Sequence, residues 1–334
     1  MSRCSCMRWG LLSLCCVLCL FFRAGGQELF ILNEPASNIP KHTLGVRAFG
    51  NTYRELNAQR NMGALRLMYG LTPKLTVMAT GTLSNHHDTI LPRFLADHTH
   101  SGSQTAGATG TVVKGLKYPY LFNGIHLYAK YRFISKDGRN EHFRAAVYAE
   151  GSFLKVAHDE TEPNLLDDTR GVGAGLITTY LKDRFAVSFT GGVIIPFEYN
   201  GYMLNNYYLG PEYNVQTELK YGNAIQYNLS FGYLLLPRHY KDYKQLNLNL
   251  YLELQGKSYA SAKIRQTDVH GTTDIQISSP LLLANHYVDI NPGIQFIVRS
   301  DLRIDFSVGL PLINRSYVHY YPLYTFGVQK YFYF

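Results

Sequence analysis

The stretch at residues 246–255 reads LNLNLYLELQ, and leucine occupies every second position of it. The residues between the leucines are Asn247, Asn249, Tyr251 and Glu253, all of which can form hydrogen bonds. Because successive side chains of a β-strand point to opposite faces, this segment would have one leucine face and one polar face. A strand of about nine to eleven residues that crosses a bilayer needs this pattern, apolar toward lipid and polar toward a lumen.

The same period of two recurs along the chain, most clearly in the C-terminal half. In residues 302–312, apolar side chains hold the even positions, and Arg303, Asp305, Ser307 and Gly309 lie between them. A period of two held this long indicates strands, not helices. The sequence predicts an all-β fold, a transmembrane antiparallel up-and-down β-barrel of about twelve strands, at residues 42–50, 62–69, 75–83, 124–134, 143–153, 171–181, 185–195, 225–235, 246–254, 290–298, 302–312 and 324–334.

The expected connections alternate in length, which supports a membrane barrel, because such barrels have short turns at the periplasmic end and long loops outside. The short ones are residues 70–74, 182–184 and 299–301, with slightly longer ones at 135–142 and 236–244. The long ones are residues 84–123, 154–170, 196–222 and 257–285. Residues 207–221 could be an additional strand or a loop hairpin, so ten or fourteen strands remain possible.

The N-terminus has the features of a secretory signal. Arg3 and Arg8 precede an apolar run at residues 9–22, and small residues at 24–26 precede a cleavage site before Gln27. We therefore expect residues 1–26 to be a signal peptide and residues 27–334 to be one outer-membrane β-barrel. All five cysteines lie at positions 4–19, which excludes a disulfide framework and a cysteine metal site in the mature chain.

The bulk composition is mildly basic and rich in tyrosine. The first 26 residues hold three arginines and no acid, which leaves 29 basic against 24 acidic residues in the mature chain. No basic cluster or recognisable module predicts nucleic-acid binding. The 27 tyrosines suit membrane interfaces, where the ring meets acyl chains and the hydroxyl meets water.

The chain ends on four aromatic residues, Tyr331-Phe332-Tyr333-Phe334. Outer-membrane barrels resemble this pattern, a last strand with alternating aromatics and a terminal phenylalanine that the barrel assembly machinery reads. The alternative is a buried terminal strand of a soluble sandwich. The expected partners are outer-membrane lipids, the assembly machinery and a small-molecule solute, in the outer membrane of a Gram-negative cell envelope.

Two regions resemble a known family. They are Tyr69-Gly70-Leu71-Thr72 followed by Leu75, and residues 289–295 running into 301–305 and Gly309. These motifs are similar to those of Gram-negative outer-membrane β-barrels labelled as transporters of a phenol-degradation pathway. The resemblance spans most of the mature chain and implies a pore or transporter-like barrel, without implying an aromatic substrate. The histidine-rich first long loop is not a feature of that family.

The alternation places a set of charged side chains on the lumen face. Basic residues dominate the first five strands and acidic residues the later ones, so basic and acidic walls would oppose each other and select polar solutes. The equal alternative is that the charges pair and plug a narrow barrel, because charges in a low-dielectric interior need partners. The candidate solute path consists of Arg47, Arg66, Lys130, Arg132, Arg144, Glu150, Glu253, Asp289, Arg303 and Asp305.

The first long loop contains a possible metal site. Imidazoles together with carboxylates suit zinc or copper, and this loop holds His86, His87, His98 and His100 with Asp88 and Asp97. Their spacing matches no closed site, so solvated surface histidines are the stronger interpretation. No cofactor is expected.

Enzymatic chemistry is not expected either. Ser84 and His86 lie on a strand end in poor geometry for a proton relay, and the acidic pairs at 159–160 and 167–168 are expected to be solvated loop residues. The glycines at 171, 173 and 175 lie in an expected strand, where we expect them to let the wall bend or a loop approach and not to bind phosphate. The sequence predicts a porin-like channel or transporter; the alternative is a non-conducting barrel whose long loops bind a partner, ligand or metal, and a barrel hydrolase comes third.

Overall fold

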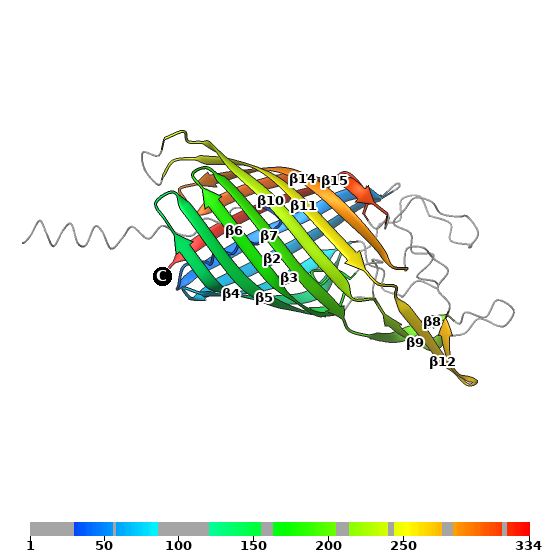
Figure 1. Ribbon diagram of the computed structural model, residues 1–334. Coiled ribbons are helices and arrows are strands. Elements are labelled where there is room, and N and C mark those ends of the chain that lie inside the picture. Colours follow the sequence, from blue (N-terminus) through cyan, green and yellow to red (C-terminus); the bar gives the residue numbers. More distant parts are fainter. Residues whose placement is uncertain are drawn as a thin grey trace, which may run out of the picture.

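Twelve antiparallel strands form a closed barrel in the computed structural model, which describes residues 30–55, 58–85, 120–154, 163–204, 214–239, 244–275, 283–315 and 319–334 (Figure 1). The barrel strands are β1 (Thr43–Glu55), β2 (Ala58–Thr72), β3 (Leu75–Ser84), β4 (Leu121–Asp137), β5 (Glu141–Leu154), β6 (Gly171–Lys182), β7 (Phe185–Pro196), β10 (Ala224–Leu236), β11 (Asn247–Tyr259), β14 (Asn285–Val298), β15 (Leu302–Asn314) and β16 (Leu323–Tyr333). Their order around the wall is β1-β16-β15-β14-β11-β10-β7-β6-β5-β4-β3-β2. Pairing of the first with the last strand closes the barrel, so no edge is left in the wall.

The predicted twelve-stranded barrel is confirmed, and each expected strand overlaps one strand of the wall. Most strands extend a few residues beyond the predicted ends, because alternation fades near the rims, where both faces become polar or aromatic. None of the described residues forms a helix long and apolar enough to cross a membrane.

The two ends of the barrel differ as expected. Tight turns join β2 to β3, β4 to β5, β6 to β7 and β14 to β15 at one end, here called the short-turn end, where the C-terminus also lies (Figure 1). In the β14–β15 turn, Arg299 and Ser300 have φ of 52° and 61°, the two positive values that a type I′ hairpin requires. The opposite end, here called the long-loop end, carries the long connections.

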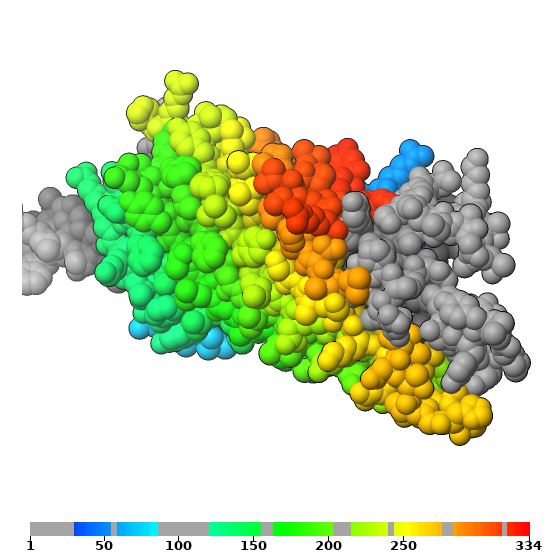
Figure 2. Space-filling model, turned by 45° about the vertical axis from the view of Figure 1, so that its right-hand side comes forward, coloured from blue at the N-terminus to red at the C-terminus, as the bar shows by residue number. Residues whose placement is uncertain are grey.

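A second sheet of four strands lies at the long-loop end, in the order β13-β12-β9-β8. It consists of β8 (Tyr199–Leu204), β9 (Asn214–Lys220), β12 (Lys263–Asp268) and β13 (Gly271–Ile275), all within two connections expected to be loops. Strand β9 lies within residues 207–221, so that region forms a strand of this outer sheet and no part of the wall. The gold strands of the sheet project beyond the barrel in Figure 2.

Burial along the wall is the reverse of that in a water-soluble protein. On β11, Leu250 and Leu252 are 42% and 39% exposed, whereas Asn249 and Glu253 are 5% and 1% exposed. Leucine, phenylalanine and valine are exposed in the same way on every side of the barrel. A water-soluble sandwich would bury these faces, so the alternation at 246–255 describes an apolar outer wall around a polar interior.

Candidate functional site: the barrel lumen

The chain before β1 runs inside the barrel, and residues 30–40 are called the inner segment below. Phe30, Ile31, Ala36 and Ile39 are all buried, at 4% exposure or less. Phe30 and Ile31 pack with Ala186 and Tyr251. Inward-facing residues of the wall thus form a core with the inner segment. The segment fills space that water would occupy in an open channel.

Glu253 on β11 binds the start of the inner segment. Its carboxylate accepts the backbone N–H groups of Ile31 (2.9 Å), Leu32 (3.0 Å) and Asn33 (3.0 Å), and also the hydroxyl of Ser230 (3.0 Å). These bonds satisfy a carboxylate that is 1% exposed without any cationic partner among the contacts. Three of its four donors belong to the segment, so Glu253 is the principal anchor of the segment.

Arg47 on β1 links the inner segment to Asp305 on β15. Its guanidinium donates to the carbonyl of Ile31 (2.8 Å) and to the carboxylate of Asp305 on β15 (3.1 Å). Strand β16 lies between these two strands. The ion pair can cross it because Gly327 has no side chain: a Cβ there would lie 2.6 Å from Asp305 Oδ1 and 3.2 Å from Arg47 Nη2.

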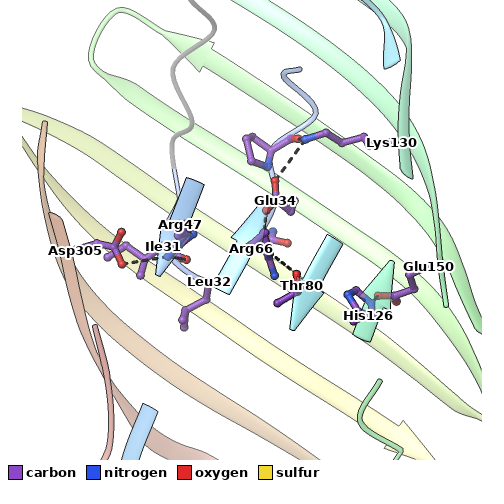
Figure 3. Close-up of polar contacts among 12 residues, drawn as sticks. Ile31, Leu32, Glu34, Arg47, Arg66, Thr80, His126, Lys130, Glu150 and Asp305 are labelled. Carbon is purple, nitrogen blue, oxygen red and sulfur yellow. Dashed lines mark hydrogen bonds and ion pairs between the residues drawn. The ribbon is translucent and has the colours of Figure 1, made fainter. Parts of the chain in front are cut away.

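Glu34 of the inner segment forms ion pairs with two basic side chains of the wall (Figure 3). Arg66 on β2 pairs with it at 2.9 Å and also donates to Thr80, while Lys130 on β4 lies 3.6 Å from it. Lys130, which is 1% exposed, also donates to the carbonyl of Pro35 at 2.5 Å. The segment therefore supplies a counter-charge to the buried Lys130 and the half-buried Arg66.

Two backbone N–H groups in the rest of the inner segment donate to two further strands. The N–H of Ala36 donates to Thr179 on β6 (2.8 Å), and the N–H of Ile39 donates to Thr76 on β3 (3.2 Å). Close to the short-turn end, Gly70 makes room for the chain, since a Cβ there would lie 2.1 Å from the carbonyl oxygen of Pro40. Contacts to strands on all sides of the barrel mean that the segment occludes the lumen at this level.

A second segment, residues 163–170, folds into the long-loop end. Leu165 packs with Ile194, Ala224 and Tyr259, and Lys257 donates to the carbonyl of Pro163 at 2.8 Å. A Cβ at Gly171 would lie 2.6 Å from the carbonyl oxygen of Ile195 on β7 and 3.1 Å from Leu165, so this glycine leaves room for both the neighbouring strand and this segment.

The acidic pair of this segment, Asp167 and Asp168, is buried, contrary to expectation. Asp167 and Asp168 are 4% and 0% exposed, so the expectation that they are solvated is wrong. The reason is that the turn supplies its own donors. Asn164 Nδ2 donates to Asp167 at 2.8 Å, and Thr169 donates to Asp168 at 3.2 Å.

The predicted lumen residues fall into three groups. Arg47, Arg66, Lys130, Glu253 and Asp305 bind the inner segment or each other, as described above. Two more lie at the short-turn end, where Arg144 donates to Ser37 (2.9 Å) and to Asp137 (2.9 Å), and Arg132 donates to the carbonyl of Pro73 (3.1 Å).

The third group consists of the remaining three residues. Glu150 pairs with His126 at 2.9 Å, and Arg303 lies over the ring of Tyr331 at 5.0 Å. Asp289, near the long-loop end, pairs with His319 at 2.9 Å and accepts the hydroxyl of Tyr321. The charges expected to oppose each other across an open lumen thus have partners close by, and several of these partners belong to the inner segment.

Sequence reasoning missed the inner segment itself, together with Glu34, His126 and Gln226. The run Phe30-Ile31-Leu32 followed by Glu34 does not alternate, so the period of two could not reveal it. The candidate metal residues His86, His87, His98 and His100 lie outside the described residues, as does the signal segment 1–26. In the part of the chain that is described, no group of three potential metal ligands occurs.

Comparison with known proteins identifies the fold. No protein-family model and no curated protein matches the chain. Among solved structures, the chain is similar to the COG4313 outer membrane channel from Pseudomonas putida F1, with a TM-score of 0.55 and 12% identity over 91% of this chain and 100% of that one. The Pseudomonas putida toluene transporter TodX aligns with a TM-score of 0.44 and 12% identity over 92% and 94% of the two chains. At this level of identity the first likeness shows that the chain has the fold of an outer-membrane channel.

Proposed function

We propose that the protein is an outer-membrane channel for small solutes, and that the inner segment closes its lumen at rest. The observation that carries this proposal is the way in which the segment is held. Glu253, Arg47, Arg66 and Lys130 bind it through hydrogen bonds and ion pairs, with no covalent link. Such contacts can break and re-form, so the same wall can offer a closed and an open state.

The walls suit this role in both states. Outside, the exposed leucine, phenylalanine and valine side chains fit acyl chains. Inside, displacement of the segment would uncover the charges that hold it, and these would then line a path for polar solutes. From the sequence features described above, we also propose that residues 1–26 direct export and are removed. The barrel assembly machinery would then recognise the aromatic last strand.

Conductance of the purified protein in planar bilayers tests this proposal. We expect discrete current steps from the full mature chain, and longer or more frequent steps after removal of residues 30–40. A protein that folds into a heat-modifiable barrel but passes no current in either form would overturn the proposal. Such silence would favour the alternative of a non-conducting scaffold, which the occluded lumen and the projecting outer sheet also suit.

A further inference from the structure

A group of polar side chains on the inner wall takes no part in holding the inner segment. It lies on the long-loop side of that segment, on the adjacent strands β4 and β5. His126 faces Ser152 directly in the register of these strands, and His126 Nε2 lies 2.9 Å from Glu150 Oε2. Figure 3 shows the His126–Glu150 pair set apart from the contacts of Glu34 and Arg66.

Three atoms of this group are buried and have no hydrogen-bond partner. They are Nδ1 of His126, Oγ of Ser152 and Nδ2 of Asn123, in side chains of residues that are 6%, 2% and 0% exposed. Asn123 is held in place through its other amide atom, which accepts the hydroxyl of Ser84 at 3.2 Å. A buried polar atom without a partner costs about 1–3 kcal/mol, so three on the adjacent strands β4 and β5 indicate groups placed to bind something other than the wall itself.

Glycines on the next two strands shape the floor of this group. Glu150 and Tyr148 lie flat over β6 and β7, where a Cβ at Gly173 would lie 2.7 Å from Glu150 and one at Gly192 would lie 2.0 Å from the hydroxyl of Tyr148. Gln226 on β10 then reaches both side chains, at 3.1 Å from Glu150 and 2.9 Å from the Tyr148 hydroxyl. The carboxylate is thereby fixed in position next to the unpartnered atoms.

The group lies between the two segments that enter the barrel. On one side, Ala36 of the inner segment packs against Tyr148. On the other side, Leu165 packs against Gly171, which is the register partner of Ser152. A solute moving along the lumen would therefore meet these side chains after passing residues 163–170 and before reaching the inner segment.

We propose that Asn123, His126, Glu150 and Ser152 form a binding site for a small neutral solute with adjacent hydroxyl groups, such as a polyol or a sugar; the inference rests on the proposed channel function. The amide nitrogen of Asn123 can only donate, the carboxylate of Glu150 only accepts, and the serine hydroxyl does both. A hydroxyl also does both, so a row of hydroxyls satisfies all of them. A simple anion would meet the charge of Glu150, and a simple cation would leave the Asn123 donor without an acceptor.

Saturation-transfer NMR of xylitol with the detergent-solubilised mature protein tests the site directly. We expect a saturable xylitol signal with the wild type, and an affinity about 2- to 12-fold weaker in Ser152→Ala, the factor that corresponds to one net hydrogen bond. Ser307→Ala is the matched control, because Ser307 is also an inner-wall serine with a buried, unpartnered Oγ but lies on β15. Its affinity should equal that of the wild type.

The outcomes separate the site from the channel. No xylitol signal with the wild type, or equal affinity in Ser152→Ala and the wild type, would overturn the site even if the protein conducts salt. Equal weakening in both serine variants would also overturn it, since the polar lumen as a whole would then be responsible. A saturable signal that Ser152→Ala weakens, from a protein that passes no current, would support the site and contradict the channel.

Discussion

Glu253 illustrates how a single buried carboxylate can hold a segment of chain through backbone groups alone. Three consecutive N–H groups of residues 31–33 converge on its two oxygens, and Ser230 completes the set. A neutral amide at this position would keep one acceptor oxygen, but its NH₂ group would face backbone donors. The anchor therefore depends on two acceptor oxygens at this position, which Gln cannot supply.

Glu253→Gln should loosen the inner segment. A buried N–H that loses its acceptor costs about 1–3 kcal/mol, so we expect the open probability of single channels to rise about fivefold or more. Glu218→Gln is the control, because Glu218 pairs with Arg265 on the outer sheet, away from the inner segment. Equal open probabilities in all three proteins would contradict the assignment of Glu253 as the anchor.

Asp137 at the short-turn end should make the fold sensitive to acid. Partial burial raises the pKa of this carboxyl, but hydrogen bonds from Ser135, Arg144 and His142 outweigh it and hold the pKa well below its usual value of 3.8. The ionised group therefore stabilises the folded state above the usual pKa, and this contribution is lost as the pH falls toward the folded-state pKa. Because the side chain is 41% exposed, we expect about 0.2–1 kcal/mol.

The comparison of Asp137→Asn with the wild type measures this contribution. Heat unfolding at neutral pH should show the variant to be less stable, and the difference should shrink from about pH 4 downwards. A difference that stays constant down to about pH 2 would show that the carboxylate charge is not its source.

At the scale of the element, each strand of the wall has an apolar outer face and a polar inner face, and β11 shows this most clearly. Its leucines Leu250 and Leu252 are exposed, and its asparagines and glutamate are buried. The strand pattern could be predicted because the polarity of each residue indicates whether its side chain faces outward or into the barrel. The inner segment could not be predicted in this way, because its position depends on partners more than a hundred residues away, such as Glu253 and Thr179.

The outer face of β11 should tolerate no charge if it contacts lipid. Leu252→Arg should destabilise the barrel in bilayers by about 2–4 kcal/mol, the cost of a basic residue near the bilayer midplane. Tyr202→Arg is the control, since Tyr202 is 70% exposed on β8 of the outer sheet. Denaturant unfolding in liposomes measures both, and equal stability of the two variants would mean that this face of β11 does not meet the hydrocarbon core.

At the scale of the whole molecule, the barrel is a fixed wall with two segments inside it. Alternation predicted the wall and the inward position of the charges, but it could not predict which charges pair. Arg47 and Asp305 lie 258 positions apart in sequence and meet only because the barrel closes and Gly327 leaves room. Of the outer sheet, only the region of β9 was considered as a strand, since the four strands are short and pair with each other across two long connections.

The same arrangement makes the inner segment suitable for a reversible covalent lock. The N–H of Ala36 lies 2.8 Å from Thr179 Oγ1, so Ala36→Cys with Thr179→Cys is the pair to join by a disulfide. All native cysteines lie at positions 4–19, so the mature double variant would contain one cysteine pair. Mass spectrometry can establish that the bond has formed before any recording is made.

Single-channel current of this double variant, recorded before and after addition of a reductant, is the most direct test that the inner segment closes a conducting lumen. We predict no current from the oxidised protein and current steps equal to those of the wild type after reduction, with Ala36→Cys alone unaffected by the reductant. Oxidised channels that conduct like the wild type would contradict the account.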